Sequence, residues 1–151
     1  MNLKYFIIAG ESSGDLHGSL LMKEMRLINS EVSFEGVGGH LMSKRGLKSF
    51  VDINKMNVMG FIEVLKKYLF FKSIQKQALA IITKGNFDGI ILVDYPGFNL
   101  RLAKKIKKMC PNIPIHYYIS PQIWAWKEER IKIVQSSIDQ MIVIFNFEKN
   151  W

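Results

Sequence analysis

The residues best suited to chemistry lie in two loops that each follow an apolar stretch. The first loop covers residues 94–99 and reads Asp-Tyr-Pro-Gly-Phe-Asn. A carboxylate at the end of a buried strand, as expected for Asp94, is partly desolvated and can act as a general base, an effect worth about 10²–10⁴ in rate. The alternative is that Asp94 only accepts backbone N–H hydrogen bonds and organises the turn around Pro96 and Gly97.

The second loop, residues 119–127, contains Pro121, Gln122 and the tryptophans Trp124 and Trp126. Large aromatic faces beside amide and hydroxyl groups suit a pocket for a ring-shaped polar ligand such as a sugar or a base. The same side chains could instead fill a domain interface, and this loop alone does not separate the two interpretations.

A third loop, residues 10–15, reads Gly-Glu-Ser-Ser-Gly-Asp and precedes a predicted helix. Its glycines permit a tight turn, and the free N–H groups of the helix can receive an anion or a hydroxyl. However, Glu11 and Asp15 would repel a phosphate, and the order Gly-x-Gly-x-x-Gly is absent, which argues against a dinucleotide site. The alternative is that Ser13 or Asp15 serves only as the N-cap of this helix.

These loops must be positioned by a regular alternation of strands and helices. Predicted strands, most of them apolar, cover residues 3–9, 33–37, 48–51, 88–93, 115–119 and 140–145. Predicted helices cover residues 16–28, 41–45, 58–83, 100–109 and 129–136.

Such an alternation predicts an α/β fold, a Rossmann-like parallel sheet with helices on both faces. In these sheets, ligands bind beyond the carboxyl ends of the strands. Four loops rich in glycine, proline or polar residues leave those ends, at residues 10–15, 38–40, 94–99 and 120–126. We therefore expect one site at this edge of the sheet.

Composition indicates one globular domain over residues 1–151, with 48% hydrophobic and 23% charged residues. A single cysteine, Cys110, excludes an internal disulfide framework and fits a reducing compartment. The first apolar run, residues 5–9, is too short for a signal peptide or a membrane span. We therefore expect a cytoplasmic protein that is soluble or peripheral to a membrane.

The net charge of +8 has several interpretations, and five basic residues fall between Arg101 and Lys108. Such a run usually forms a solvated helix face, but it can also attract anionic lipid, at about 1 kcal/mol per residue, or nucleic acid phosphates. No RNA-binding aromatic motif accompanies it, which disfavours nucleic acid. The three histidines, including His116, which is expected to be buried, show no metal-ligand spacing, so no metal is predicted.

The long predicted helix at residues 58–83 has two interpretations. Most of its large apolar residues form one stripe that would face the core: Phe61, Val64, Leu65, Tyr68, Phe71, Leu79 and Ile82. Phe70 and Ile74 lie off that stripe, beside Lys66 and Lys67. Apolar residues among lysines suit a helix that contacts a membrane or acyl chains, with Lys66, Lys67, Phe70 and Phe71 as the contact residues.

Five segments together closely resemble the lipid-A-disaccharide synthase family. They are residues 10–15, Met-Gly-Phe at 59–61, residues 93–99, residues 120–126 and Phe-Glu-Lys at 147–149. They occur in the family's order and spacing, although Asn146 stands where proline is expected. The resemblance implies the acceptor-side, N-terminal half of a GT-B glycosyltransferase, with the C-terminal donor-binding domain outside this chain.

The resemblance also implies an activity, without a metal or cofactor. The family transfers 2,3-diacylglucosamine, with inversion, from UDP-2,3-diacylglucosamine to 2,3-diacylglucosamine 1-phosphate, at the cytoplasmic face of the inner membrane. By motif position, Asp94 would be the general base. The remaining motif residues would line the substrate cleft: Glu11, Ser13, Gly14, Asn99, Gln122 and Trp124. Because the family's chains are more than twice as long, we expect negligible transfer by these residues alone; a non-catalytic module that binds acylated sugar phosphate or a membrane is the alternative.

Overall fold

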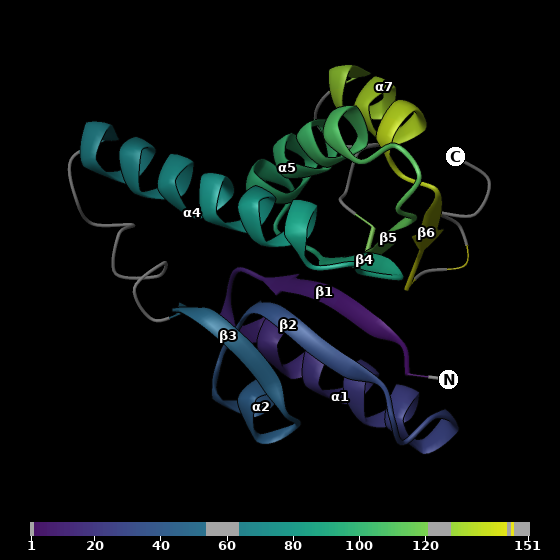
Figure 1. Cartoon of the computed structure of the whole chain (residues 1–151). Helices are drawn as coiled ribbons and strands as arrows, with labels where there is room; N and C mark the ends of the chain where they lie inside the picture. The colour runs from purple at the N-terminus through teal and green to yellow at the C-terminus, as the bar shows by residue number, and fades with distance from the viewer. Residues whose placement is uncertain (1, 54–63, 121–127, 145, 147–151) are drawn as a thin grey trace.

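The structure is a computed structural model that describes residues 2–53, 64–120, 128–144 and 146. The described residues form one six-stranded sheet in the order β3-β2-β1-β4-β5-β6, and all of the strand pairs are parallel (Figure 1). The strands are β1 (Lys4–Ala9), β2 (Ser33–Gly38), β3 (Leu47–Asp52), β4 (Gly89–Val93), β5 (Ile115–Tyr118) and β6 (Gln140–Ile142). This is the Rossmann strand order, in which successive strands are added on one side of β1 up to β3 and then on its other side from β4 on; the switch point lies between β1 and β4.

Helices cover both faces of the sheet (Figure 1). One face carries α1 (Ser12–Ile28) and α2 (His40–Lys44), which contact each other. The opposite face carries α4 (Val64–Lys84), α5 (Pro96–Met109) and α7 (Glu128–Ser137), with α5 in contact with both neighbours. The predicted Rossmann-like α/β arrangement is therefore confirmed.

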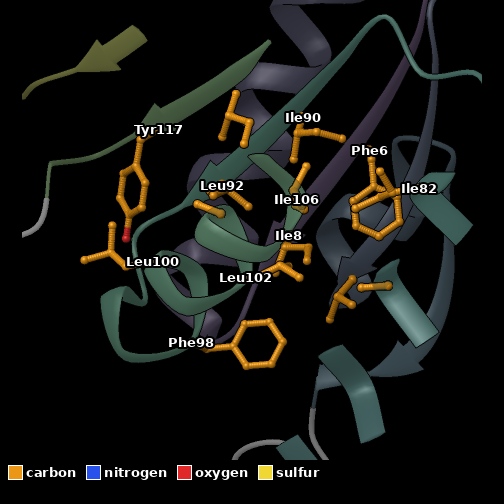
Figure 2. Close-up of a cluster of buried hydrophobic side chains, with 14 of the residues drawn as sticks. Phe6, Ile8, Ile82, Ile90, Leu92, Phe98, Leu100, Leu102, Ile106 and Tyr117 are labelled. Carbon is orange, nitrogen blue, oxygen red and sulfur yellow. The ribbon is translucent and has the colours of Figure 1, made fainter. Parts of the chain in front are cut away.

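The central strands are apolar throughout because both of their faces are buried. On β1, Phe6 and Ile8 pack into the core under α4 and α5, shown in Figure 2, whereas Ile7 and Ala9 pack into a second core under α1 and α2. All four side chains are fully buried. Successive residues of a strand point to opposite faces, so one strand contributes to both cores.

Several predicted boundaries were wrong, and the start of α5 matters most for the site. The helix begins at Pro96, with the proline in its first turn, whereas the sequence analysis placed residues 96–99 in a loop. Proline lacks only an N–H group that would be unpaired there, and its fixed φ suits a helix start. Similarly, α1 begins at Ser12 and not at residue 16.

The predicted core stripe of α4 was wrong only in part, because Ile82 is buried as predicted. Ile74, expected to lie off the stripe, is only 1% exposed, whereas Tyr68, expected in the core, is 53% exposed. The buried stripe runs through Ile74, Ala78 and Ile82, at helical spacing, so the helix is rotated relative to the prediction. Residues 54–63, the predicted beginning of this helix, lie outside the described residues.

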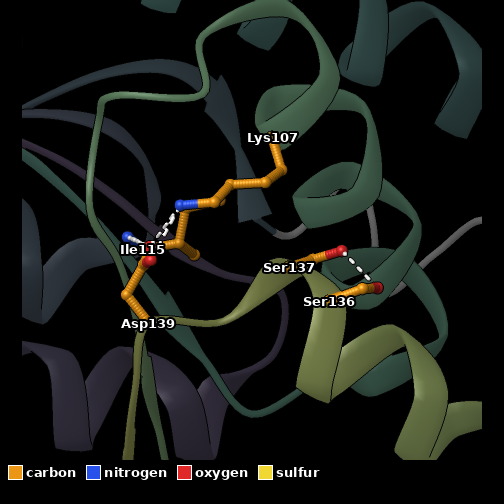
Figure 3. A network of polar contacts seen from close by, with 5 residues as sticks. All are labelled: Lys107, Ile115, Ser136, Ser137 and Asp139. Carbon is orange, nitrogen blue, oxygen red and sulfur yellow. Dashed lines mark hydrogen bonds and ion pairs between the residues drawn. The ribbon is translucent and has the colours of Figure 1, made fainter.

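Polar contacts stabilise the amino ends of β5 and β6, at the end of the sheet opposite the predicted site. Lys107 Nζ on α5 lies 2.7 Å from Asp139 Oδ1, and the Ile115 N–H donates to Asp139 Oδ2 at 2.8 Å (Figure 3). The hydrogen bond from Lys107 holds the pKa of the Asp139 carboxyl below its usual range. His116, expected to be buried, is only partly buried, and its Nδ1 lies 2.9 Å from Gln140 Oε1.

Asp15 joins the two helices on one face of the sheet. It is 6% exposed, and its carboxylate accepts backbone N–H hydrogen bonds from Gly39 (2.8 Å), Leu41 (3.0 Å) and Met42 (3.0 Å). Gly39, the N-cap residue of α2, makes no side-chain capping hydrogen bond. Asp15 therefore caps α2 from a distance, and it is not the N-cap of its own helix, where Glu11 takes that place.

We predict that Asp15→Ala lowers the free energy of unfolding by about 3 kcal/mol, because two buried N–H groups and one partly buried N–H group lose a charged acceptor. Asp15→Asn keeps one carbonyl oxygen and should give a smaller loss. Urea unfolding of the 151-residue chain measures both. Glu24→Ala, which changes an exposed carboxylate on the same helix, is the control and should change stability by no more than about 0.5 kcal/mol. Equal stability of Asp15→Ala and wild type would contradict this role.

Candidate functional site at the switch point of the sheet

Two loops leave the sheet side by side at the switch point. Ala9 ends β1 and Val93 ends β4, and the two residues are paired in register. The loop after β1 begins at Gly10, and a side chain there would meet the ring of Tyr95, because a Cβ would lie 2.4 Å from Tyr95 Cδ1. Glycine is therefore needed at position 10 to let the two loops pack closely.

Strained backbone conformations occur directly after the carboxyl ends of β4 and β5. Four non-glycine residues in the described part of the chain have positive φ, and three of them follow strands here: Asp94 (φ 44°), Tyr95 (φ 49°) and Ile119 (φ 71°). Such conformations cost of order 1–3 kcal/mol each and persist only where surrounding contacts hold them. The costliest backbone of the described residues thus lies where the sequence predicted a site.

Hydrogen bonds hold the Asp94–Tyr95 turn in this conformation. The Asp94 N–H donates to the Tyr118 carbonyl at 2.9 Å. The Asp94 carbonyl accepts two hydrogen bonds, from Tyr117 Oη at 2.6 Å and from Asn99 Nδ2 at 2.7 Å. Asn99 is fully buried, and its Nδ2 also donates to the Val93 carbonyl at 3.2 Å. In this structure the Asn99 amide therefore supports the turn.

The Asp94 carboxylate is half-buried, and its surroundings disfavour its charge. Burial raises the pKa of Asp94, and the nearby charge of Glu11 raises it further, while the backbone N–H of Tyr95 and the charge of His17 act in the opposite direction. Burial and Glu11 likewise raise the pKa of Tyr95. A carboxylate in such surroundings has a stronger tendency to take a proton, as a general base requires.

Glu11 is held close to this carboxylate by the start of α1. It is the N-cap residue of the helix, and Ser13 Oγ donates to Glu11 Oε1 at 2.6 Å. Gly14 is buried, and a Cβ there would lie 3.2 Å from Ala9 Cβ, so the first turn of α1 packs directly on the end of β1. The predicted residues of this loop thus lie at the switch point, with Ser13 exposed and Gly14 enclosed.

A pocket of about 470 Å³ adjoins the turn, between α4 and the beginning of α5. Its walls are mainly apolar, and Lys67 and Arg101 add positive charge. Pockets of this kind bind ligands that combine an apolar part with an anionic group. The lining residues are Lys67, Tyr68, Phe71, Gln75, Tyr95, Pro96, Gly97, Phe98 and Arg101.

The structure brings together only part of the predicted site. Lys67 and Phe71 line the pocket. Phe70 packs edge-on against Phe71, with 5.6 Å between the ring centroids, and Lys66 is exposed. Gln122 and Trp124 lie outside the described residues.

Sequence reasoning missed Tyr95, Arg101 and Tyr117 as site residues. Arg101 was treated as part of a basic run, and Tyr117 was not singled out within the predicted strand at residues 115–119. Only the position of Tyr95, immediately after Asp94, was a signal that could have identified it.

Two further properties concern the described residues alone. They include no group of three or more His, Cys, Asp or Glu side chains arranged to hold a metal ion. Among the described helices, none combines the length and the apolar character needed to cross a membrane.

A parallel sheet in this order, with a glycine turn and a carboxylate at its switch point, defines a Rossmann-like ligand-binding domain. The family model described as lipid-A-disaccharide synthetase matches residues 5–151. The chain belongs to this family. It is similar to lipid-A-disaccharide synthase of Geobacter metallireducens, with 41% identity over 147 residues, and of Coxiella burnetii (strain Dugway 5J108-111), with 36% identity over 148 residues.

The match covers nearly all of this chain but a minor part of each relative. It includes 97% of the chain and 38% of the Geobacter protein, and 98% of the chain and 39% of the Coxiella protein. The match to lipid-A-disaccharide synthase 1 of Legionella pneumophila, at 41% identity, covers 95% of this chain and 37% of that protein. The chain thus spans less than two fifths of the length of these curated relatives.

We predict that Asp94→Asn stabilises the chain at neutral pH. Because the folded-state pKa of Asp94 is raised, the protonated carboxyl favours the folded state. This contribution is fully present below the unfolded-state pKa, about 3.9, and is lost as pH rises through the folded-state pKa, where the carboxyl ionises. Asparagine does not ionise and tolerates positive φ. The gain in free energy of unfolding should therefore be full at pH 7 and disappear below about pH 4.

Urea unfolding at a series of pH values measures this difference. Asp88→Asn, which changes an exposed carboxylate next to the other end of β4, is the matched control and should give no gain at pH 7. A loss of stability in Asp94→Asn at pH 7 would show that the carboxylate is stabilised by its surroundings and would contradict the prediction.

Proposed function

We propose that the chain provides the acceptor side of a lipid-A-disaccharide synthase. The reaction is the inverting transfer of 2,3-diacylglucosamine from UDP-2,3-diacylglucosamine to 2,3-diacylglucosamine 1-phosphate, which yields lipid A disaccharide phosphate and UDP. The observation that carries the proposal is the Asp94 carboxylate, half-buried on a strained turn at the switch point and adjacent to an apolar pocket with positive charge. Family membership supports the same reaction class.

In this mechanism Asp94 is the general base. Its carboxylate takes the proton of the acceptor's 6-hydroxyl as that oxygen forms a bond to C1 of the donor sugar. The bond between C1 and the UDP oxygen breaks at the same time, and UDP leaves with the electron pair. A single displacement inverts C1, so the protein need only deprotonate the acceptor and stabilise the leaving group.

The remaining predicted residues serve substrate binding in this proposal. Glu11 and Ser13 accept hydrogen bonds from sugar hydroxyls at the start of α1, while Gly14 and Asn99 shape the two loops. Gln122 and Trp124 contact the sugar from the loop after β5. The pocket at Phe71 and Phe98 receives an acyl chain, and Lys67 and Arg101 attract the substrate's phosphate.

A second candidate is a non-catalytic module that binds acylated sugar phosphate. The apolar pocket beside Lys67 and Arg101 supports it, because such a pocket can hold acyl chains and a phosphate without any transfer step. Both candidate functions use the acceptor pocket, but only the synthase takes part in glycosyl transfer.

We predict that the chain alone transfers negligibly and that its fusion to the remaining carboxyl-terminal length of the Geobacter relative restores transfer from UDP-2,3-diacylglucosamine. In this fusion, Asp94→Asn should lower kcat by about 10²–10⁴, the value of a general base, and Asp88→Asn should leave kcat unchanged. Full activity of Asp94→Asn would rule out Asp94 as the base. Binding of 2,3-diacylglucosamine 1-phosphate without transfer by the fusion would favour the binding module.

We also propose that the exposed face of α4 rests on the cytoplasmic face of the inner membrane. Tyr68 and Leu69 are 53% and 55% exposed, and Lys72 Nζ lies 5.7 Å from the centre of the Tyr68 ring. The lysine-bearing helices α4 and α5 lie on the same side of the sheet (Figure 1). Exposed apolar side chains among lysines favour an interface with anionic lipid.

We predict that Tyr68→Ser/Leu69→Ser weakens binding to vesicles that contain phosphatidylglycerol, measured by co-sedimentation, without loss of the folded state. These residues are better targets than Phe70 and Phe71, which pack against the core. The control is Leu27→Ser/Ile28→Ser, an even more exposed apolar pair on α1 at the other face of the sheet, which should bind as wild type. Undiminished binding by the α4 variant would contradict the proposed contact.

A further inference from the structure

Tyr117 connects the core under α5 to the turn that carries Asp94. It lies on β5, where it pairs in register with Leu92 of β4, and it is fully buried. Its ring belongs to the larger core cluster together with Leu100 and Phe98 of α5 (Figure 2). At the far end of the ring, the hydroxyl donates to the Asp94 carbonyl at 2.6 Å.

The second donor to the same carbonyl comes from α5. Asn99 Nδ2 lies 2.7 Å from the Asp94 carbonyl oxygen. A carbonyl oxygen has two lone pairs, so these two donors occupy both of them. Two fixed donors on one oxygen define the plane of the peptide between Asp94 and Tyr95, and thereby the ψ of Asp94 and the φ of Tyr95.

We propose that Tyr117, together with Asn99, is a positioning residue that holds the carboxylate of Asp94 in its reactive orientation. The inference rests on the proposed function, in which Asp94 is the base. The turn has positive φ at both Asp94 and Tyr95, a conformation that neither residue type prefers. Removal of one donor permits the turn to relax, including the positive φ of Asp94 that sets the direction of its Cα–Cβ bond, and the carboxylate then moves.

The chemistry of residue 117 supports a role for the hydroxyl beyond core filling. A phenylalanine would fill the same volume without placing a hydroxyl in the core, and a buried hydroxyl is unfavourable unless it is hydrogen-bonded. Burial and the charge of Asp94 raise the pKa of Tyr117 far above its usual range, so the hydroxyl remains a donor at any pH at which the protein functions. The donor is therefore permanent.

The first test needs no transfer activity. In the 151-residue chain, Tyr117→Phe should lower the pKa of Asp94 toward its ordinary value, measured by NMR titration of the carboxyl carbon, as the carboxylate moves toward water. Besides burial, the groups that act on this carboxyl are Glu11, His17 and the Tyr95 N–H, and the substitution removes none of them. An Asp94 pKa equal to that of wild type would overturn the proposal.

The matched control for this substitution is Tyr5→Phe. Tyr5 lies near the amino end of β1, away from Asp94, and is paired with Gly89, the first residue of β4. This variant also removes one tyrosine hydroxyl, and it should leave the Asp94 titration unchanged. A shift of equal size in Tyr5→Phe would mean that any loss of a hydroxyl disturbs the site, and would overturn the specific role of Tyr117.

The second test measures transfer by the fusion described above. Tyr117→Phe should lower kcat about 10- to 100-fold, the range expected when a reacting group is displaced by up to about 1 Å, and should change KM less than about twofold. In the Asp94→Asn background the same substitution should cause no further loss of kcat, because no base remains to be positioned.

The outcomes separate this inference from the proposed function. If Asp94→Asn retains full activity, the assignment of the base is wrong and both fail. If Asp94→Asn is slow and Tyr117→Phe keeps the kcat and the Asp94 pKa of wild type, only the positioning role fails. An equal loss of kcat from Tyr117→Phe in both backgrounds would indicate a general structural effect and would also overturn it.

Discussion

The parallel pairing of β1 with β4 is the constraint on which the rest of this structure depends. Both strands are buried on both faces, so their register is fixed by two cores at once, and Ala9 lies opposite Val93 where they end. The chain must leave both strands at the same point and turn onto opposite faces of the sheet. The close contact of Gly10 with the Tyr95 ring, and the αL turn at Asp94, follow from this shared exit.

The amino and carboxyl ends of the strands differ in how their charged groups are paired. At the amino ends of the strands, charges are paired: the Lys4 N–H donates to Asp88, Lys4 Nζ lies 3.0 Å from Glu35, and Lys107 binds Asp139. At the carboxyl ends, by contrast, the chain holds strained backbone and places Glu11 close enough to Asp94 to raise its pKa. Such a difference is expected when contacts at the amino ends of the strands stabilise the fold and the carboxyl ends carry a functional site.

The fold could be predicted from sequence because buried parallel strands are continuous apolar runs, as in β4. The site could be predicted only in part. Asp94 was identified because a charged residue directly after such a run is unusual. Tyr117 was not, because its partner is a main-chain carbonyl, which no side-chain pattern reveals. The capping role considered for Asp15, as one alternative, concerned only its own helix, since only the fold shows that α2 begins beside it. Similarly, Pro96 was interpreted as a turn residue although it opens α5.

The charge around Asp94 also constrains how an anionic sugar lipid can approach. Glu11 lies on the α1 side of the turn, where its charge opposes a phosphate but can accept hydrogen bonds from neutral hydroxyls. Lys67 and Arg101 lie on the other side, at the apolar pocket between α4 and α5. A ligand with a phosphate and acyl chains is therefore best accommodated with both of these on the α4–α5 side and its hydroxyls toward Glu11. That orientation would bring a sugar hydroxyl, and not the phosphate, to the Asp94 carboxylate, as the proposed base catalysis requires.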